Sequence, residues 1–138
     1  MLIIAFSYSI LLSQMAKKKN LSYEEKMAKV LESLPSPLED KKHRILIVFE
    51  NSRARSNETR FEHIINERHE LKPSDIRRIL HKINTSSLKK DQERKDTYNL
   101  YIERNNYGKE YIKISMELNF KRSNIATVKT IFITTNLK

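Results

Sequence analysis

The sequence predicts an α+β fold in which helices come first and an antiparallel β-meander follows, with the helices packed on one face of the sheet. Two patterns predict this order. Between residues 22 and 83, apolar residues recur three and four positions apart, which is the spacing of amphipathic helices. From residue 97 onward they recur at every second position, which is typical of strands. With 138 residues the chain has the length of one ordinary domain, so residues 22–138 are expected to form a single folded unit.

The first 21 residues are expected to be an appendage to that unit. They begin with an apolar run of about a dozen residues and continue with the basic start Met15-Ala-Lys-Lys-Lys. A membrane-spanning helix needs about 20 residues, and a secretory signal carries its positive charge before the apolar run, so no firm membrane association is expected. Met15 is a candidate for the natural start. The alternatives are a membrane-surface anchor and an added core helix.

Three helices are predicted from apolar spacing and from signals at their ends. Ser22 and Glu25 form the pattern of a capping box, so the first helix starts there, and it ends before the prolines within residues 35–37. A second apolar stripe begins at Phe61. The third helix starts at Pro73, since proline suits the first turn of a helix. The residues expected to face the core are Tyr23, Met27, Val30, Leu31, Leu34, Phe61, Ile64, Ile65, Ile76, Ile79, Leu80 and Ile83.

Four strands are predicted, separated by polar segments. The segments that are rich in β-branched residues or alternate in polarity are residues 44–50, 97–104, 109–118 and 125–135. The last three are expected to be consecutive antiparallel strands, the first two of them joined by a hairpin around Gly108. Residues 51–59 are expected to be a mobile basic loop, and residues 86–96 a polar, lysine-rich connection.

Alternation along the meander divides its residues between two faces. Apolar residues such as Leu100 and Ile114 face the core, which leaves a second, open face that is polar, aromatic and basic. The members expected on this open face are Thr97, Asn99, Tyr101, Tyr111, Lys113 and Ser115. In the last strand both alternating sets contain apolar residues, and periodicity leaves open which set is exposed. The two sets are Val128, Thr130 and Phe132, and Lys129, Ile131 and Ile133.

The charge balance points to a polyanionic partner. The chain carries 27 Lys and Arg against 17 Asp and Glu, a net charge of +10, which favours binding of nucleic acid. The alternative is that the charge only keeps the protein soluble. Candidate nucleic-acid contacts are Arg77 and Arg78 on the third helix and Tyr101, Tyr111 and Lys113 on the open sheet face. A tyrosine there either stacks on a base or only packs.

Basic residues with histidines but without a carboxylate cluster suit the cleavage of RNA by its own 2′-hydroxyl. The reaction needs a base, an acid, and cations or hydrogen-bond donors around the phosphorane, but no metal and no other cofactor. Histidine fits both proton roles because its ordinary pKa is near neutrality. The phosphate would be held by Arg68, Lys113, Lys129 and Thr130. Cysteine is absent, which excludes disulfides, zinc–cysteine sites and a thiol nucleophile.

The second predicted helix carries two histidines. If it is regular, His69 lies on the flank of the apolar stripe, Arg68 lies near the stripe, and His63 lies on the far side. His63 is then expected to be solvated, unless the segment is irregular. His69 either transfers protons or only offsets the dipole at the helix C-terminus. His43 and His81 are expected to be surface residues.

Several short motifs between residues 44 and 135 follow one another in a recognisable order. A strand is followed by an HI…RH segment, a helix beginning Pro73-Ser74-Asp75-Ile76, a tyrosine strand, a YIKIS strand and a closing VKTIF strand. This order resembles the phage-borne members of the barnase–EndoU–colicin–RelE (BECR) nuclease superfamily. The resemblance implies a metal-independent RNase, often a toxin carried on a mobile element, whose helices precede a sheet with the active site on its open face.

The same resemblance assigns residues and partners. It implies that the catalytic residues are His63, His69, Arg68, Lys129 and Thr130. RNA is the implied substrate, and an acidic antitoxin or immunity protein is the implied partner. We therefore expect a cytoplasmic, metal-independent endoribonuclease that serves as a toxin or a mobile-element effector.

Two alternatives to this enzyme stay open. One is a noncatalytic module that binds RNA or another nucleic acid with the same face and charge. The other is an inactive relic of the nuclease fold that binds a partner protein. Cleavage of RNA in EDTA separates the enzyme from both alternatives, and salt-sensitive RNA binding separates the module from the relic.

Overall fold

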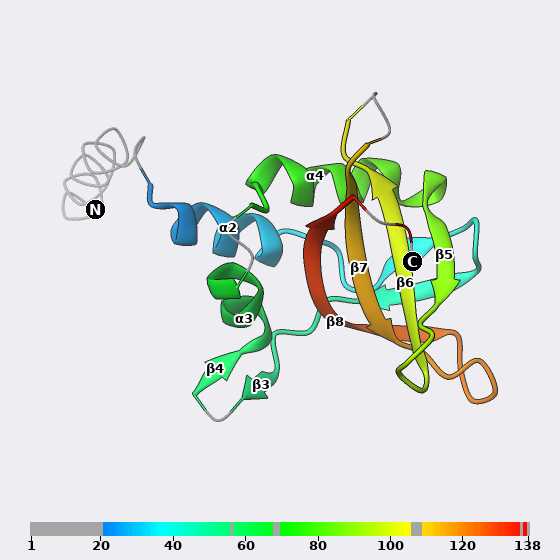
Figure 1. The fold of residues 1–138 in the computed structure, drawn as a ribbon. Coiled ribbons are helices and arrows are strands. Elements are labelled where there is room, and N and C mark those ends of the chain that lie inside the picture. Colours follow the sequence, from blue (N-terminus) through cyan, green and yellow to red (C-terminus); the bar gives the residue numbers. More distant parts are fainter. Residues whose placement is uncertain (1–20, 56, 68–69, 106–108, 136, 138) are drawn as a thin grey trace, which may run out of the picture.

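The computed structural model describes residues 21–55, 57–67, 70–105, 109–135 and 137 (Figure 1). Within them the chain has the expected α+β fold. Its helices are α2 (Tyr23–Glu32), α3 (Arg60–Glu67) and α4 (Pro73–Lys82), the last continued by a 3-10 turn, η2 (Ile83–Thr85). Its strands are β1 (Leu38–Asp40), β2 (Ile45–Val48), β3 (Arg53–Arg55), β4 (Glu58–Thr59), β5 (Ser87–Lys90), β6 (Thr97–Glu103), β7 (Tyr111–Glu117) and β8 (Ile125–Thr134).

The N-terminal appendage predicted for residues 1–21, with the candidate start Met15, lies outside the described residues except for Leu21. Of the helices in the described ranges, none is long and apolar enough to cross a membrane.

Two helices start where their sequence signals predict. At α2 the Glu25 amide donates to the Ser22 hydroxyl at 3.1 Å, and the Ser22 amide donates to the Glu25 carboxylate at 3.5 Å. These bonds confirm the predicted capping box. At α4 Pro73 is the first helical residue, and the Lys72 amide donates to the Asp75 carboxylate at 2.8 Å. Local bonds of this kind satisfy amides that the helix itself leaves unpaired.

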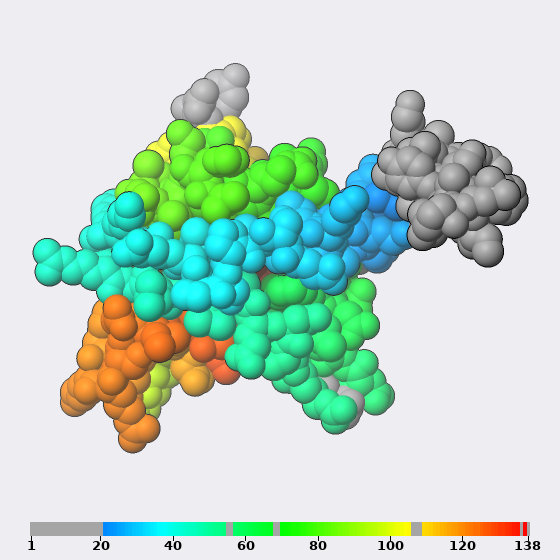
Figure 2. Space-filling model, turned by 180° about the vertical axis from the view of Figure 1, so that it is seen from behind, coloured from blue at the N-terminus to red at the C-terminus, as the bar shows by residue number. Residues whose placement is uncertain are grey.

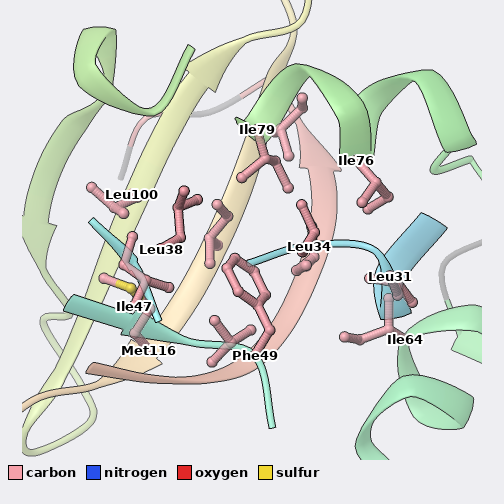
Figure 3. Packing of buried hydrophobic residues seen from close by; sticks show 14 of the residues in the cluster. Leu31, Leu34, Leu38, Ile47, Phe49, Ile64, Ile76, Ile79, Leu100 and Met116 are labelled. Atoms are coloured by element: carbon pink, nitrogen blue, oxygen red, sulfur yellow. The ribbon is translucent and has the colours of Figure 1, made fainter. Parts of the chain in front are cut away.

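One hydrophobic core lies between the sheet and the helices. The first two strands bring Leu38 and Ile47 toward Leu100 of β6 and Met116 of β7, as Figure 3 shows. The isoleucines of α4 cover this core from one side. The apolar stripe predicted for α4 is wrong at Leu80, which is 38% exposed, because the buried face centres on the isoleucines and leaves Leu80 at its edge.

The six-stranded sheet has the strand order β1-β2-β8-β7-β6-β5. β6, β7 and β8 form the predicted antiparallel meander. β2, predicted within residues 44–50, lies parallel to the start of β8, with Leu46 opposite Ile125. The connection between this parallel pair therefore contains α3, α4 and most of the meander. Figure 2 shows from behind how the segment from α2 to β2 crosses the molecule between α4 and the β7–β8 connection.

Two segments that were expected to be irregular contain strands. Within residues 51–59, expected to be a mobile loop, β3 pairs with β4 as a short antiparallel ribbon beside α3 (Figure 1). Within residues 86–96, expected to be a connection, β5 pairs with β6 at the sheet edge, with Ser87 opposite Tyr101. All three strands are short and mostly polar or charged, as edge strands commonly are, so apolar alternation gives no signal for them.

A bulge in β8 decides which residues of the last strand are buried. Thr130 and Val128 pair with consecutive residues of β7, so Lys129 is an extra residue in the ladder. Because of this extra residue, Val128 and Ile131 are both buried although they are three positions apart. Neither of the two alternating sets is exposed as a whole. Lys129 and Thr130 are half-buried.

Candidate functional site

The sheet face away from the core is less open than the sequence predicts. Asn99, Tyr101 and Ser115 are 1%, 2% and 5% exposed. The Lys113 ammonium lies over the ring of Tyr101, 5.7 Å from the ring centroid. Asp91, in the turn before β6, accepts a hydrogen bond from the side-chain amide of Asn99 at 3.2 Å. The expectation of an open face is therefore wrong at its centre, and the ring of Tyr101 is not accessible to a stacking base in this conformation.

Charge and burial on this covered face shift two pKa values. Backbone hydrogen bonds from the residues that follow Asp91, and then the bond from Asn99, lower the pKa of the Asp91 carboxyl, and the charge of Lys113 acts in the same direction. Burial, and then the charge of Asp91, raises the pKa of Tyr101, while its hydrogen bond with Asn99 acts in the opposite direction. Near neutral pH the carboxyl is thus charged and the phenol neutral, which suits packing under a lysine.

α3 starts one residue earlier than predicted because of a second capping box. The Thr59 amide donates to the Glu62 carboxylate at 2.8 Å, and the Glu62 amide donates to the Thr59 hydroxyl at 3.3 Å. The Phe61 amide donates to the side chain of Asn51 at 2.9 Å. These bonds fix the first turn of α3 and place Arg60 within it.

Arg60 joins α3 to the bulge in β8. Its Nη1 donates to the backbone carbonyl of Lys129 at 3.3 Å. Lys129 is the extra residue of the bulge, and β2 pairs with β8 only as far as Thr127, so this carbonyl is available to accept the bond. Two polar atoms here, Nε of Arg60 and Oγ1 of Thr130, are buried and have no hydrogen-bond partner in the part of the chain that the structure describes. Each buried polar atom without a partner costs about 1–3 kcal/mol.

His63 lies one helical turn after Arg60 and pairs with Glu58 from β4. Its Nδ1 is 2.8 Å from a Glu58 carboxylate oxygen, and the two side chains are 14% and 19% exposed. The expectation that His63 is solvated is wrong, because Glu58, the residue before the Thr59 cap, reaches the first turn of α3 and pairs with the ring. A carboxylate on Nδ1 fixes the ring tautomer and leaves Nε2 to exchange a proton.

One hydrogen bond, from Arg60 to the Lys129 carbonyl, joins α3 to β8, and we call the place where these two elements meet the α3–β8 junction, with Arg60 and His63 on α3 and Lys129 and Thr130 on β8. Residues three apart on a helix lie on the same side of it, so Arg60 and His63 are neighbours on α3. Lys129 and Thr130 come from β8, where the carbonyl of Lys129 binds Arg60. The Lys129 ammonium is 3.3 Å from the carboxylate of the exposed Glu117, and a pair with an exposed partner contributes little to stability and leaves the lysine able to bind an anion.

β7 contributes two of the nucleic-acid contacts predicted from the sequence. Lys113 lies on the same sheet face as Thr130. Thr130 is paired with Ser115, and Ser115 and Lys113 are two residues apart on β7, so their side chains point to the same face. Its ammonium is 5.2 Å from the ring centroid of Phe132. Tyr111, at the start of β7, is half-buried. Lys113 is thus the predicted contact that lies nearest along the sheet to the α3–β8 junction.

The other predicted site residues lie elsewhere. Arg68 and His69 are outside the described residues, so their roles stay predictions. Arg77 is exposed on α4. Its neighbour Arg78 turns toward the sheet, where its Nε donates to the Glu103 carbonyl at 2.6 Å.

The two histidines that were expected on the surface differ from each other. His81 is exposed on α4, as predicted. His43 is mostly buried, and its Nδ1 is 2.6 Å from the carboxylate of Asp40, which is fully buried. The His43 amide also donates to Asp40 at 3.2 Å. This pair fixes the turn between β1 and β2 and has a structural role.

Arg104 holds the segment that leads from α3 into α4. Its guanidinium is 3.0 Å from the Asp75 carboxylate and 3.4 Å from the Glu110 carboxylate, and it donates to the Glu70 carbonyl at 2.9 Å. Burial lowers the pKa of Arg104, but hydrogen bonds and charges from the two carboxylates outweigh burial, so the net shift is upward. The guanidinium therefore stays charged and ties α4 to the β6–β7 hairpin.

Arg104→Ala is expected to lower the free energy of unfolding by roughly 3 kcal/mol, because it leaves the carboxylate of Asp75, only 4% exposed, without its cation. Urea unfolding measures the change. Arg94→Ala is the control, since Arg94 is exposed in the turn before β6. A loss below about 1 kcal/mol would mean that water solvates the Asp75 carboxylate in the variant and that the ion pair with Arg104 contributes little to stability.

Sequence reasoning missed Arg60 and Glu58 as site residues. The pattern Thr59-x-x-Glu62 is a capping-box signal that places Arg60 in the first turn of a helix. The same signal places Glu58 just before the cap and His63 in the fourth helical position, and side chains at these two positions commonly meet. Within the described ranges, no group of three or more His, Asp or Glu side chains is arranged to hold a metal ion.

No protein-family model matches the chain, and comparisons with curated proteins and with solved structures found no match. Function is therefore inferred from the residues themselves.

Proposed function

We propose that this protein is a metal-independent endoribonuclease and that the α3–β8 junction holds the scissile phosphate of RNA. The observation that carries the proposal is the pair of buried polar atoms, Nε of Arg60 and Oγ1 of Thr130, that lack partners among the described residues. A phosphate offers only acceptors, which match guanidinium and hydroxyl donors.

Binding requires a small rearrangement at Arg60. The bond from its Nη1 to the Lys129 carbonyl is 3.3 Å, which is long for an N–H···O bond. Exchanging it for two bonds to a phosphate gives the guanidinium its preferred bidentate geometry. The same exchange gives Nε a partner, and the adjacent Thr130 hydroxyl can donate to the same phosphate. Lys129 adds a second positive charge nearby.

His63 is the base in the proposed reaction. With Nδ1 on the Glu58 carboxylate, its Nε2 takes the proton from the 2′-hydroxyl, and the 2′-oxygen attacks phosphorus. The bond between phosphorus and the 5′-oxygen breaks, and that oxygen takes a proton from an acid, for which the sequence predicts His69. The products are a 2′,3′-cyclic phosphate and a 5′-hydroxyl. Arg60 stabilises the charge of the phosphorane.

The carboxylate on His63 favours an enzyme over a binding module. A surface that only binds phosphates needs cations, and a half-buried pair with Glu58 adds nothing to its affinity. A catalytic base, in contrast, needs a fixed tautomer and orientation. If the protein acts as a toxin, as the BECR resemblance implies, the net charge of +10 suits an acidic antitoxin or immunity protein as partner.

The expected result is that the purified protein cleaves single-stranded RNA in EDTA and leaves 2′,3′-cyclic phosphate ends, which mass spectrometry identifies. Its affinity for RNA should fall with salt, with a log–log slope of about −0.7 for each phosphate it contacts. Cleavage that requires an added divalent cation would contradict the mechanism. Salt-sensitive binding without cleavage would identify the protein as a noncatalytic binding module.

A further inference from the structure

A pocket of about 600 Å³ lies between α2 and α4, which Figure 1 shows side by side. None of the residues of the α3–β8 junction lines it. Its charged lining residues are all cationic, namely Lys26 and Lys29 of α2, Lys72 before α4, and Arg77 of α4. Val30 and Pro73 add an apolar surface to its wall.

The four cations of this α2–α4 pocket have no carboxylate within ion-pair distance in the part of the chain that the structure describes. Glu25, one turn before Lys29, is bonded to Ser22 in the capping box. Asp75, at the start of α4, is bonded to Arg104. Four positive charges around one hollow repel one another, and an anion bound among them removes that repulsion.

We propose that the α2–α4 pocket is a second contact for single-stranded RNA, which holds one nucleotide unit of the chain that is cleaved at the α3–β8 junction. This proposal rests on the proposed function for the identity of its ligand. The volume falls in the range of about 300–1,000 Å³ typical of pockets for small ligands. Cations bind the phosphates, and Val30 and Pro73 give a ribose or a base an apolar surface.

RNA fits this pocket better than a membrane surface does. Anionic lipid headgroups are spread over a plane, and they favour a flat or convex basic surface. A concave site with cations around an apolar wall instead accepts a single flexible strand, of which each unit carries one phosphate and one base.

The double variant Lys29→Glu with Arg77→Glu is expected to weaken binding of a short fluorescein-labelled single-stranded RNA by about tenfold or more. Its salt slope should decrease by about 0.7 for each of the two lost phosphate contacts. The control is Lys82→Glu with Lys121→Glu, which makes the same change of net charge at exposed residues outside the pocket. Equal losses in the two double variants would overturn the pocket as a binding site.

Cleavage assays separate this proposal from the proposed function. In the pocket variant the KM for RNA is expected to rise while kcat at saturating RNA is unchanged. A KM equal to that of the control variant would overturn the pocket while leaving catalysis intact. If the wild type shows no cleavage in EDTA, selective loss of RNA affinity in the pocket variant still supports the pocket. Selective loss of binding to phosphatidylserine vesicles, with RNA binding retained, would overturn the choice of RNA.

Discussion

Replacing His63 or His69 by alanine is expected to lower the rate of RNA cleavage in EDTA by at least about a hundredfold, because a positioned acid or base contributes about 10²- to 10⁴-fold. For His63 the reason is the Glu58 carboxylate 2.8 Å from Nδ1, which directs Nε2 toward proton transfer. For His69 the reason is its predicted role as the acid. Initial rates at saturating RNA, taken well below the melting temperature of each variant, measure the loss.

His81→Ala is the matched control, since His81 is exposed on α4, and it should cleave like the wild type. Full activity in His63→Ala would mean that the pair with Glu58 only stabilises α3 and has no part in catalysis.

Sequence signals predicted the elements whose stabilising contacts lie between residues close together in the chain. The capping box of Ser22 and Glu25 and the proline at position 73 fixed the starts of two helices, because the bonds that stabilise these starts lie within three residues. The three strands of the meander were predicted for the same reason, since each pairs with its neighbour in the sequence. The parallel pair of β2 and β8 has no such signal, because Leu46 and Ile125 are far apart in the chain.

The candidate site was predicted only in part, for the same physical reason. Lys129 and Thr130 were chosen from the last strand, but alternation assumes a regular strand and gives no indication of a bulge. The carbonyl that binds Arg60 belongs to Lys129, the extra residue of this bulge. Likewise, alternation along its own strand predicted that Tyr101 is exposed to solvent. Lys113, which lies over its ring, belongs to the next strand, so the pattern of one strand gives no indication of this contact.

Thr130→Val is expected to make the protein more stable and less active. Valine keeps the shape of the side chain and removes a buried hydroxyl that has no partner among the described residues, which stabilises the fold by about 1 kcal/mol or more. In a domain of this size 1 kcal/mol corresponds to roughly 2–8 °C in Tm. The same hydroxyl is the proposed donor to the phosphate. A hydrogen bond to a charged group contributes about 1.5–3 kcal/mol, so kcat/KM should fall about tenfold to a hundredfold.

The opposite signs of these two effects are what make the Thr130→Val variant informative, since stability is commonly lost where a site is preorganised for a ligand. Thr127→Val is the matched control, the same substitution on the same strand at a half-buried position, and neither its Tm nor its rate should change appreciably. A Thr130→Val protein that is more stable and fully active would leave the hydroxyl without a role in cleavage. One that is less stable would mean that water already satisfies the hydroxyl in the free protein, which would remove the observation on which the phosphate site rests.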